Sequence, residues 1–264
     1  MNLFNIFRRR KNENMIYLKS DAEIDDMKES CKLAAATLNF IEDHIKPGIS
    51  TLELNDLCHK YILDHKAIPA PLNYKGFPKS ICTSVNNVVC HGIPKSSEVL
   101  KKGDIINVDI TTILDGYHGD TSRTFIVGET SEKTQLLVER TQKAMMLGIE
   151  AVKIGGRIGD IGAAIQNYAE SFGYGVVKDF VGHGIGKNFH EKPQIPHYGK
   201  KGTLGRFKPG MVFTIEPMIN EGDWRTEILD DDWTAITIDD SLSAQFEHTI
   251  AIRSNGEVEI LTLV

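Results

Sequence analysis

The chain repeats itself at a spacing of 107 residues, and this repeat limits the folds open to it more than any other feature. IKPGISTLEL (45–54) matches VKIGGRIGDI (152–161), and LKKGDIINVDITTI (100–113) matches FKPGMVFTIEPMIN (207–220), in the same order and at the same spacing. A unit of this length is too long for a solenoid, so the repeat predicts two pseudo-symmetric halves. Its register pairs Asp109 with Glu216. A shorter match at another spacing, VCHGI (89–93) with VGHGI (181–185), pairs His91 with His183.

The order of the predicted elements also fits two similar halves. Apolar residues at helical spacing follow Ser20, and Ser50 with Glu53 forms a capping box in front of a second helix. The predicted helices are 20–45, 50–66, 131–152 and 158–172, the predicted strands are 81–90, 104–127, 174–181, 211–220, 234–240, 246–253 and 257–263, and 67–79 is a predicted loop. Helices followed by strands, twice over, indicate the α+β class.

Composition excludes some classes of protein. A net charge of −6 argues against a general nucleic-acid binder, which usually carries a basic patch. No apolar run reaches membrane-spanning length. The four cysteines form no CxxC pair, which favours a reducing compartment, and we expect a cytoplasmic protein. Residues 1–14 contain a basic cluster and are expected to form a disordered extension, with a weak surface anchor as the alternative.

The segment DITTILDGYHGDTSRTF (109–125) predicts a hairpin with two aspartates in its strands. A two-residue turn at Asp115-Gly116 would pair Thr111 with Asp120 and Asp109 with Ser122. The two aspartates would then share one face as diagonal neighbours, roughly 7–8 Å apart at Cα. Bare carboxylates so close would repel each other, and a divalent cation between them would remove that repulsion.

The hairpin by itself is also compatible with a solvated strand face, with an acid pair that shares a proton, or with an isolated Ca²⁺ site. The second half of the chain weighs against the solvated face. Glu216 in MVFTIEPM and Glu247 in SAQFEHTIAI are both expected inside apolar strands, where burying a charge is costly.

An imidazole completes a candidate metal site. His183 lies between glycines in GHGIG, which leave room for a ligand or a close backbone approach, although a packed histidine is the commoner reading of such a residue. With Asp109, Asp120, Glu216 and Glu247 it forms a set that suits two ions such as Mn²⁺, Fe²⁺, Co²⁺ or Zn²⁺. Two metals bridged by carboxylates can activate a water molecule, so the set indicates hydrolysis.

Five separated motifs together resemble type I methionine aminopeptidases. They are VVCHGIP (88–94), NVDITTILDGYHGDTSRTF (107–125), VGHGIGKNFHEKP (181–193), TIEPM (214–218) and SAQFEHT (243–249). The resemblance implies the pita-bread fold, with one catalytic domain over 15–264 and halves of about 20–130 and 131–264. The interval from Glu216 to Glu247 leaves no space for the helical insertion of the type II enzymes, so the chain is similar to the compact bacterial or organellar form.

The resemblance also implies a role for each site residue. The metal ligands would be Asp109, Asp120, His183, Glu216 and Glu247, with Asp120 and Glu247 bridging. His91 would contact the substrate near its amine or scissile nitrogen, His190 would polarise the scissile carbonyl, and Glu216 would shuttle a proton.

A methionine pocket is implied as well. Its walls would be Tyr74, Phe77, Cys82, Phe189 and Trp233, with ordinary aromatic core as the alternative. Pro71 and Phe77 stand where relatives often have Cys and Tyr, which leaves the detail of the pocket open. A nucleophilic role for Cys82 is disfavoured because no acid–base partner lies beside it in the sequence.

The implied activity is removal of the initiator methionine from nascent polypeptides, with a preference for small second residues and with two divalent metal ions as cofactors. The implied protein is a monomer that requires neither a membrane nor nucleic acid, and contact with the ribosome stays open. Two alternatives are another pita-bread hydrolase, such as a proline-specific peptidase, and a non-catalytic module that has lost its metals. Those peptidases usually carry an additional N-terminal domain, and a module without metals would not need acid or His at all five ligand positions.

Overall fold

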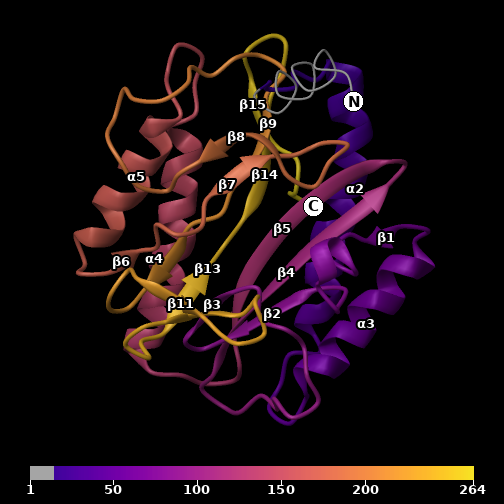
Figure 1. Ribbon diagram of the computed structural model, residues 1–264, viewed down its shortest axis with the longest axis vertical. Coiled ribbons are helices and arrows are strands. Elements are labelled where there is room, and N and C mark those ends of the chain that lie inside the picture. The colour runs from indigo at the N-terminus through magenta and orange to yellow at the C-terminus, as the bar shows by residue number, and fades with distance from the viewer. Residues whose placement is uncertain (1–14) are drawn as a thin grey trace, which may run out of the picture.

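The structure is a computed structural model that describes residues 15–264, so the extension expected over 1–14 lies outside the described residues. Figure 1 shows two groups of elements side by side, each with a pair of helices. The first group contains α2 (Asp21–Glu42), α3 (Thr51–Asp64), β1 (Ile68–Pro69), the short 3₁₀ helix η1 (Tyr74–Gly76), β2 (Cys82–Val85), β3 (Val88–Cys90), β4 (Ile105–Leu114) and β5 (Tyr117–Ile126).

The second group begins with α4 (Glu132–Glu150) and α5 (Gly159–Glu170). Its strands are β6 (Gly175–Val176), β7 (Gly182–Gly184), β8 (Glu191–Ile195), β9 (Val212–Ile215), β10 (Met218–Asn220), β11 (Thr226–Ile228), β12 (Ala235–Thr237), β13 (Ser243–Gln245), β14 (His248–Ile252) and β15 (Val258–Ile260). Within residues 15–264, no helix combines the length and the apolar character needed to cross a bilayer.

Serine side chains begin three of the helices. Ser20 and Ser50 each accept a hydrogen bond from the backbone N–H of the glutamate three residues later, and that glutamate side chain accepts from the serine N–H in return. The capping box expected at Ser50 is therefore confirmed. Ser131 caps α4 by accepting from the Thr134 N–H. These bonds satisfy N–H groups that a helix cannot satisfy within itself.

The hairpin of β4 and β5 has the predicted register. Asp115 and Gly116 have φ values of 50° and 82°, and the type I′ turn requires a positive φ at both central positions. Thr111 pairs with Asp120 and Asp109 with Ser122, as expected. In β4, residues 106, 108 and 110 are buried in the apolar core, and residues 107, 109 and 111 alternate with them.

A second long hairpin is broken where its acids stand. β9 pairs with β14 and β10 with β13, and the two ladders continue one register, with Ile215 opposite His248 and Met218 opposite Gln245. The same register places Glu216 opposite Glu247 in the break. The expectation that these glutamates lie inside strands was therefore wrong, since both occupy the gap between two strands. Pro217 accounts for part of the gap because it has no N–H to donate to a ladder.

Several short strands differ from the prediction. The strand expected over 174–181 is reduced to Gly175–Val176, and 81–90 and 211–220 are each divided into two strands. β1, β7, β8, β11 and β13 were not predicted. β7 consists of Gly-His-Gly and β8 contains Pro193, and both compositions disfavour strands unless neighbouring strands hold them in place.

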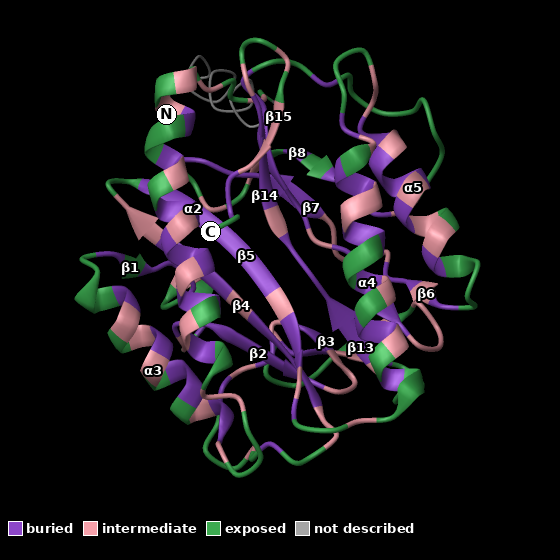
Figure 2. Ribbon diagram, turned by 180° about the vertical axis from the view of Figure 1, so that it is seen from behind, coloured by how far each residue is buried: buried purple, intermediate pink, exposed green. Residues whose placement is uncertain are grey.

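Figure 2 shows α2 and α4 in front of the strands when the molecule is seen from behind, so the helices cover one face of the sheets. One core cluster joins α2 and α3 to β4, and another joins α4 and α5 to β9 and β14. A third connects the two groups, because Ile24, Met27 and Cys31 of α2 pack with Val212 and Ala251. A fully buried aliphatic side chain of this kind contributes about 1.5–3 kcal/mol.

Candidate metal centre

One cavity of about 330 Å³ brings together every site residue expected from the sequence. Its walls include the five expected metal ligands, the two expected catalytic histidines and the expected pocket residues: Tyr74, Phe77, Cys82, His91, Asp109, Asp120, His183, Phe189, His190, Glu216, Trp233 and Glu247. These residues come from both halves of the chain, so the cavity exists only where the two halves meet.

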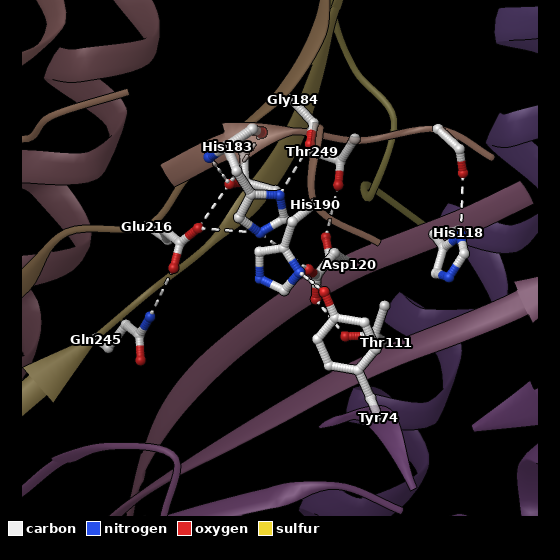
Figure 3. Close-up of polar contacts among 12 residues, drawn as sticks. Tyr74, Thr111, His118, Asp120, His183, Gly184, His190, Glu216, Gln245 and Thr249 are labelled. Carbon is white, nitrogen blue, oxygen red and sulfur yellow. Dashed lines mark hydrogen bonds and ion pairs between the residues drawn. The ribbon is translucent and has the colours of Figure 1, made fainter. Parts of the chain in front are cut away.

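Three buried side chains form the tightest group. Asp120, His183 and Glu247 each offer one ligand atom, and these atoms all lie within 4.8 Å of one another. His183 Nε2 lies 3.7 Å from Asp120 Oδ2 and 3.6 Å from Glu216 Oε1, which adds a second carboxylate beside the imidazole (Figure 3). Asp109 lines the same cavity from the neighbouring position on the first hairpin.

The two hairpins are joined at the acids. Glu247 N donates to Ser122 O at 3.0 Å, and Thr121 Oγ1 donates to Glu247 O at 2.7 Å. In the other direction, Thr249 Oγ1 donates to Asp120 O at 2.8 Å. These bonds fix the backbone of Asp120 against that of Glu247, so the two carboxylates are positioned before any ligand arrives.

Hydrogen bonds also orient the individual ligand groups. Thr111 Oγ1 donates to Asp120 Oδ1 at 2.7 Å, and Thr214 Oγ1 donates to Glu216 Oε1 at 2.6 Å (Figure 3). His183 Nδ1 lies 3.0 Å from Gly184 O, so Nδ1 carries the proton and donates it to that carbonyl. The other nitrogen, Nε2, then presents its lone pair to the acids, as a metal-binding imidazole requires.

The acids are held in an environment that favours their neutral form. Burial raises the pKa of Asp109 to about 7. Burial, together with the charge of Asp109, raises the pKa of Glu216 to about 8 against the lowering effect of the Thr214 hydrogen bond. Burial and the neighbouring carboxylates raise the pKa of Asp120 and of Glu247 well above the usual range. Burial lowers the pKa of His183 to about 4.

Positive charge from the protein does not compensate these acids. Within residues 15–264, no Lys or Arg lies within 4 Å of the four carboxylates. Lys75 is the one Lys or Arg of that region lining the cavity, and its Nζ lies over the Tyr74 ring, 5.2 Å from the centroid. Clustered carboxylate oxygens with one imidazole nitrogen fit divalent ions that accept mixed O and N ligands.

Aromatic rings form the far wall of the cavity. The Phe77 and Trp233 rings meet edge to face with centroids 5.2 Å apart, and Phe77 is buried. His91 lies edge-on to Phe180 at 5.4 Å, and its backbone has a φ of 56°. Burial lowers the pKa of His91 to about 4, so its ring is neutral at pH 7.

Cys82 has the character of a wall residue. Its side chain is buried, and burial with the nearby charge of Asp109 raises the pKa of the thiol well above its usual range. A thiol in this state is a poor nucleophile.

His190 stands at the mouth of the cavity. Its Nδ1 lies 3.0 Å from Tyr74 Oη, and its ring stacks on the Tyr74 ring with centroids 5.4 Å apart (Figure 3). The His183 ring lies 4.2 Å away, centroid to centroid. Loss of solvent around the ring and the neighbouring His183 lower the pKa of His190.

Two supporting residues were not predicted from the sequence. Thr214 binds Glu216 and also accepts from His183 N at 3.0 Å, and buried His197 accepts the Glu216 N–H through Nε2 at 3.0 Å. The repeat could have identified Thr214, because it is the counterpart of Asn107, two residues before Asp109. Residues two apart share a strand face. His197 had no such signal, because it comes from a separate loop.

The fold and this site define a metallopeptidase of the pita-bread class. Residues 25–254 match metallopeptidase family M24, and the chain belongs to that family. It is 62% identical to methionine aminopeptidase A of Synechocystis sp. over 248 residues, which are 94% of this chain and 98% of the relative.

Solved structures show the same fold. The crystal structure of methionine aminopeptidase from Rickettsia prowazekii superposes with a TM-score of 0.92 at 56% identity, covering 94% of this chain and 100% of that one. A more distant neighbour, an Xaa-Pro dipeptidase from Bacillus anthracis, has a TM-score of 0.74 at 25% identity and covers 96% of this chain but 63% of that protein. The expected pita-bread fold is therefore confirmed.

Proposed function

We propose that the chain is a methionine aminopeptidase that hydrolyses the N-terminal methionine from nascent polypeptides and prefers a small second residue. The observation that carries the proposal is the buried acid–imidazole cluster, which opens directly onto an aromatic pocket. The similarity to methionine aminopeptidases supports the activity, since the chain spans nearly the whole length of the Synechocystis and Rickettsia proteins.

Two divalent ions would be held by Asp109, Asp120, His183, Glu216 and Glu247. Asp120 and Glu247 are the best candidates for bridging ligands because they are the carboxylates within the tightest group. Bound divalent ions would supply an activated water and stabilise negative charge on the reacting carbonyl. Co²⁺, Mn²⁺, Fe²⁺ and Zn²⁺ all accept this ligand set, and none is favoured by the residues alone.

The chain's own residues would then act on the substrate. Glu216 would accept a proton on its carboxylate and pass it on, as a general acid–base group beside the reacting bond does. His190 is neutral at pH 7 and would donate from Nε2 to the scissile carbonyl oxygen. His91, also neutral, would accept or donate beside the scissile nitrogen.

The methionine side chain would occupy the aromatic part of the cavity. Phe77 and Trp233 form one wall, and Tyr74 and Phe189 form another, with ring centroids 4.9 Å apart. Apolar rings on two sides suit the flexible thioether, which makes favourable contacts with aromatic groups. Cys82 would close the pocket as a small apolar wall.

We further propose that residues 15–264 act as one catalytic domain, preceded by an extension over 1–14, and that the protein works as a monomer in the cytoplasm on chains leaving the ribosome. All four cysteines are free and buried, which suits a reducing compartment. No membrane or nucleic acid is required by the reaction proposed.

A substrate panel tests this function. The protein is stripped with chelator and reloaded with Mn²⁺, Co²⁺ or Fe²⁺, then given Met-Gly-Met-Met, Met-Leu-Met-Met and an X-Pro peptide. Release of methionine from the glycine peptide, slower release from the leucine peptide and none from the X-Pro peptide are expected. Cleavage only before proline would favour the function of the Xaa-Pro dipeptidase neighbour, and absence of release with every metal would refute the enzyme.

A further inference from the structure

A second cavity adjoins the metal centre at His183. It has a volume of about 420 Å³ and shares three wall residues, Val181, His183 and His190, with the first cavity. The residues lining it are Met15, Tyr17, Val181, Gly182, His183, Asn188, His190, Glu191, Lys192 and Gln194. None of the proposed methionine-pocket residues belongs to it. We call it the downstream groove.

Met15 and Tyr17 form one wall of the groove. They belong to the segment 15–20, which precedes α2 and is held in place at Lys19. Lys19 N donates to Gly210 O at 2.7 Å, and Lys19 Nζ lies 2.6 Å from Glu191 Oε2. Both charged side chains are almost fully buried, at 7% and 4% exposure. Gly186 lies so close that a Cβ there would stand 2.7 Å from Lys19 Cε. This buried ion pair holds the segment that carries Met15 and Tyr17 against Glu191, which also lines the groove.

The floor of the groove is the face of β7 and β8 that carries His183. His183 pairs with Gln194 across these strands, so both side chains stand on the same face. Gln194 is exposed, and within residues 15–264 its side-chain amide makes no hydrogen bond. An amide offers two donors and an acceptor, which match the C=O and N–H groups of an extended peptide whatever its sequence.

We propose that the downstream groove binds the substrate chain beyond the scissile bond, with Gln194 binding its backbone and Tyr17 forming a side wall. The inference rests on the proposed function. His190 lines both cavities, so a scissile carbonyl held by His190 has the methionine side chain in the first cavity and the following residues directed into the second. Backbone recognition suits an enzyme whose substrates share their first residue and little else.

The test compares a short and a long substrate in Gln194→Ala. The holoenzyme is assayed with Met-Gly-NH₂, which ends after the first residue beyond the bond, and with Met-Gly-Met-Met-NH₂. Both peptides are amidated, so Lys192 meets no terminal carboxylate. We expect kcat/KM for the long peptide to fall about 3- to 10-fold, through KM, as typical for one lost hydrogen bond, and kcat/KM for the short peptide to change less than about 2-fold.

Gln135→Ala is the matched control, because Gln135 is an exposed glutamine on α4 that lines neither cavity. Tyr17→Ala should repeat the pattern of Gln194→Ala with the two peptides. If Gln194→Ala lowers kcat/KM for both peptides by the same factor, or leaves both values unchanged, the groove is refuted while the aminopeptidase activity stands. Failure of the unmodified holoenzyme to release methionine from either peptide would instead refute the proposed function.

A binding measurement needs no turnover. The product Gly-Met-Met-NH₂ should bind the metal-free protein with protection of β8 amides from hydrogen exchange, and protection should be lost in Gln194→Ala. Protection confined to segments outside β7, β8 and the 15–20 segment would place the peptide elsewhere and overturn the groove.

Discussion

Removing the Tyr74 hydroxyl should slow the reaction without weakening the binding of the methionine side chain. Neutral His190 has one ring proton, and it can donate to a carbonyl only when that proton is on Nε2. Tyr74 Oη lies 3.0 Å from His190 Nδ1, so a hydroxyl that donates to Nδ1 keeps the proton on Nε2. Tyr74→Phe removes this control but keeps the ring that packs against Phe189 and stacks on His190.

One hydrogen bond contributes about 1 kcal/mol, which corresponds to about a five-fold loss in kcat, with KM little changed because the ring remains. Steady-state release of methionine from Met-Gly-Met-Met measures both constants. Tyr61→Phe is the control, since Tyr61 lies against the α2–α3 core and stacks on Phe40, away from the cavity. An unchanged kcat in Tyr74→Phe would refute tautomer control, and a loss confined to KM would assign Tyr74 to the pocket alone.

Three further outcomes are expected. Asp109→Ala should lower metal content, measured by elemental analysis, and activity together. His190→Ala should lower kcat by about 10²-fold with metal content unchanged. Loss of metal from His190→Ala would contradict the role of His190 in polarising the carbonyl. Glu216 has a folded pKa of about 8, above its usual value, so its protonation stabilises the metal-free protein at low pH and this contribution disappears as pH rises toward 8. Glu216→Gln should therefore raise the Tm of the metal-free protein more at pH 8 than at pH 5. A larger increase at pH 5 would contradict the raised pKa of Glu216. A Cβ on Gly119 would lie 2.3 Å from Cys31 N of α2, so Gly119→Ala should lower the free energy of unfolding by about 3 kcal/mol, measured by denaturant unfolding. Gly205→Ala is the control, because the nearest atom to its added Cβ is 3.4 Å away, and it should leave the stability almost unchanged.

The sequence predicted those parts of the site that depend on local geometry. The Asp-Gly turn determines the pairing of β4 with β5, and strand alternation then places Asp109 and Asp120 on one face, as observed. The repeat correctly related Glu216 to Asp109 as a second acid lining the same cavity.

Features that depend on distant contacts were beyond the sequence. The break that holds Glu216 and Glu247 between strands arises from the pairing of β9–β10 with β13–β14, and no local pattern describes it. The Gly-His-Gly strand β7 exists because β8 and β9 flank it. His197 reaches Glu216 from a loop whose position depends on the whole second half.

Anomalous diffraction from crystals of the Mn²⁺-loaded protein would show whether the four carboxylates and His183 hold two metal ions. We expect two peaks in the cavity, each within about 2.0–2.6 Å of carboxylate oxygens, with Asp120 and Glu247 contacting both and His183 contacting one. Peaks at other positions, or a loaded and active protein with no peak beside Asp120 and Glu247, would contradict this two-metal site.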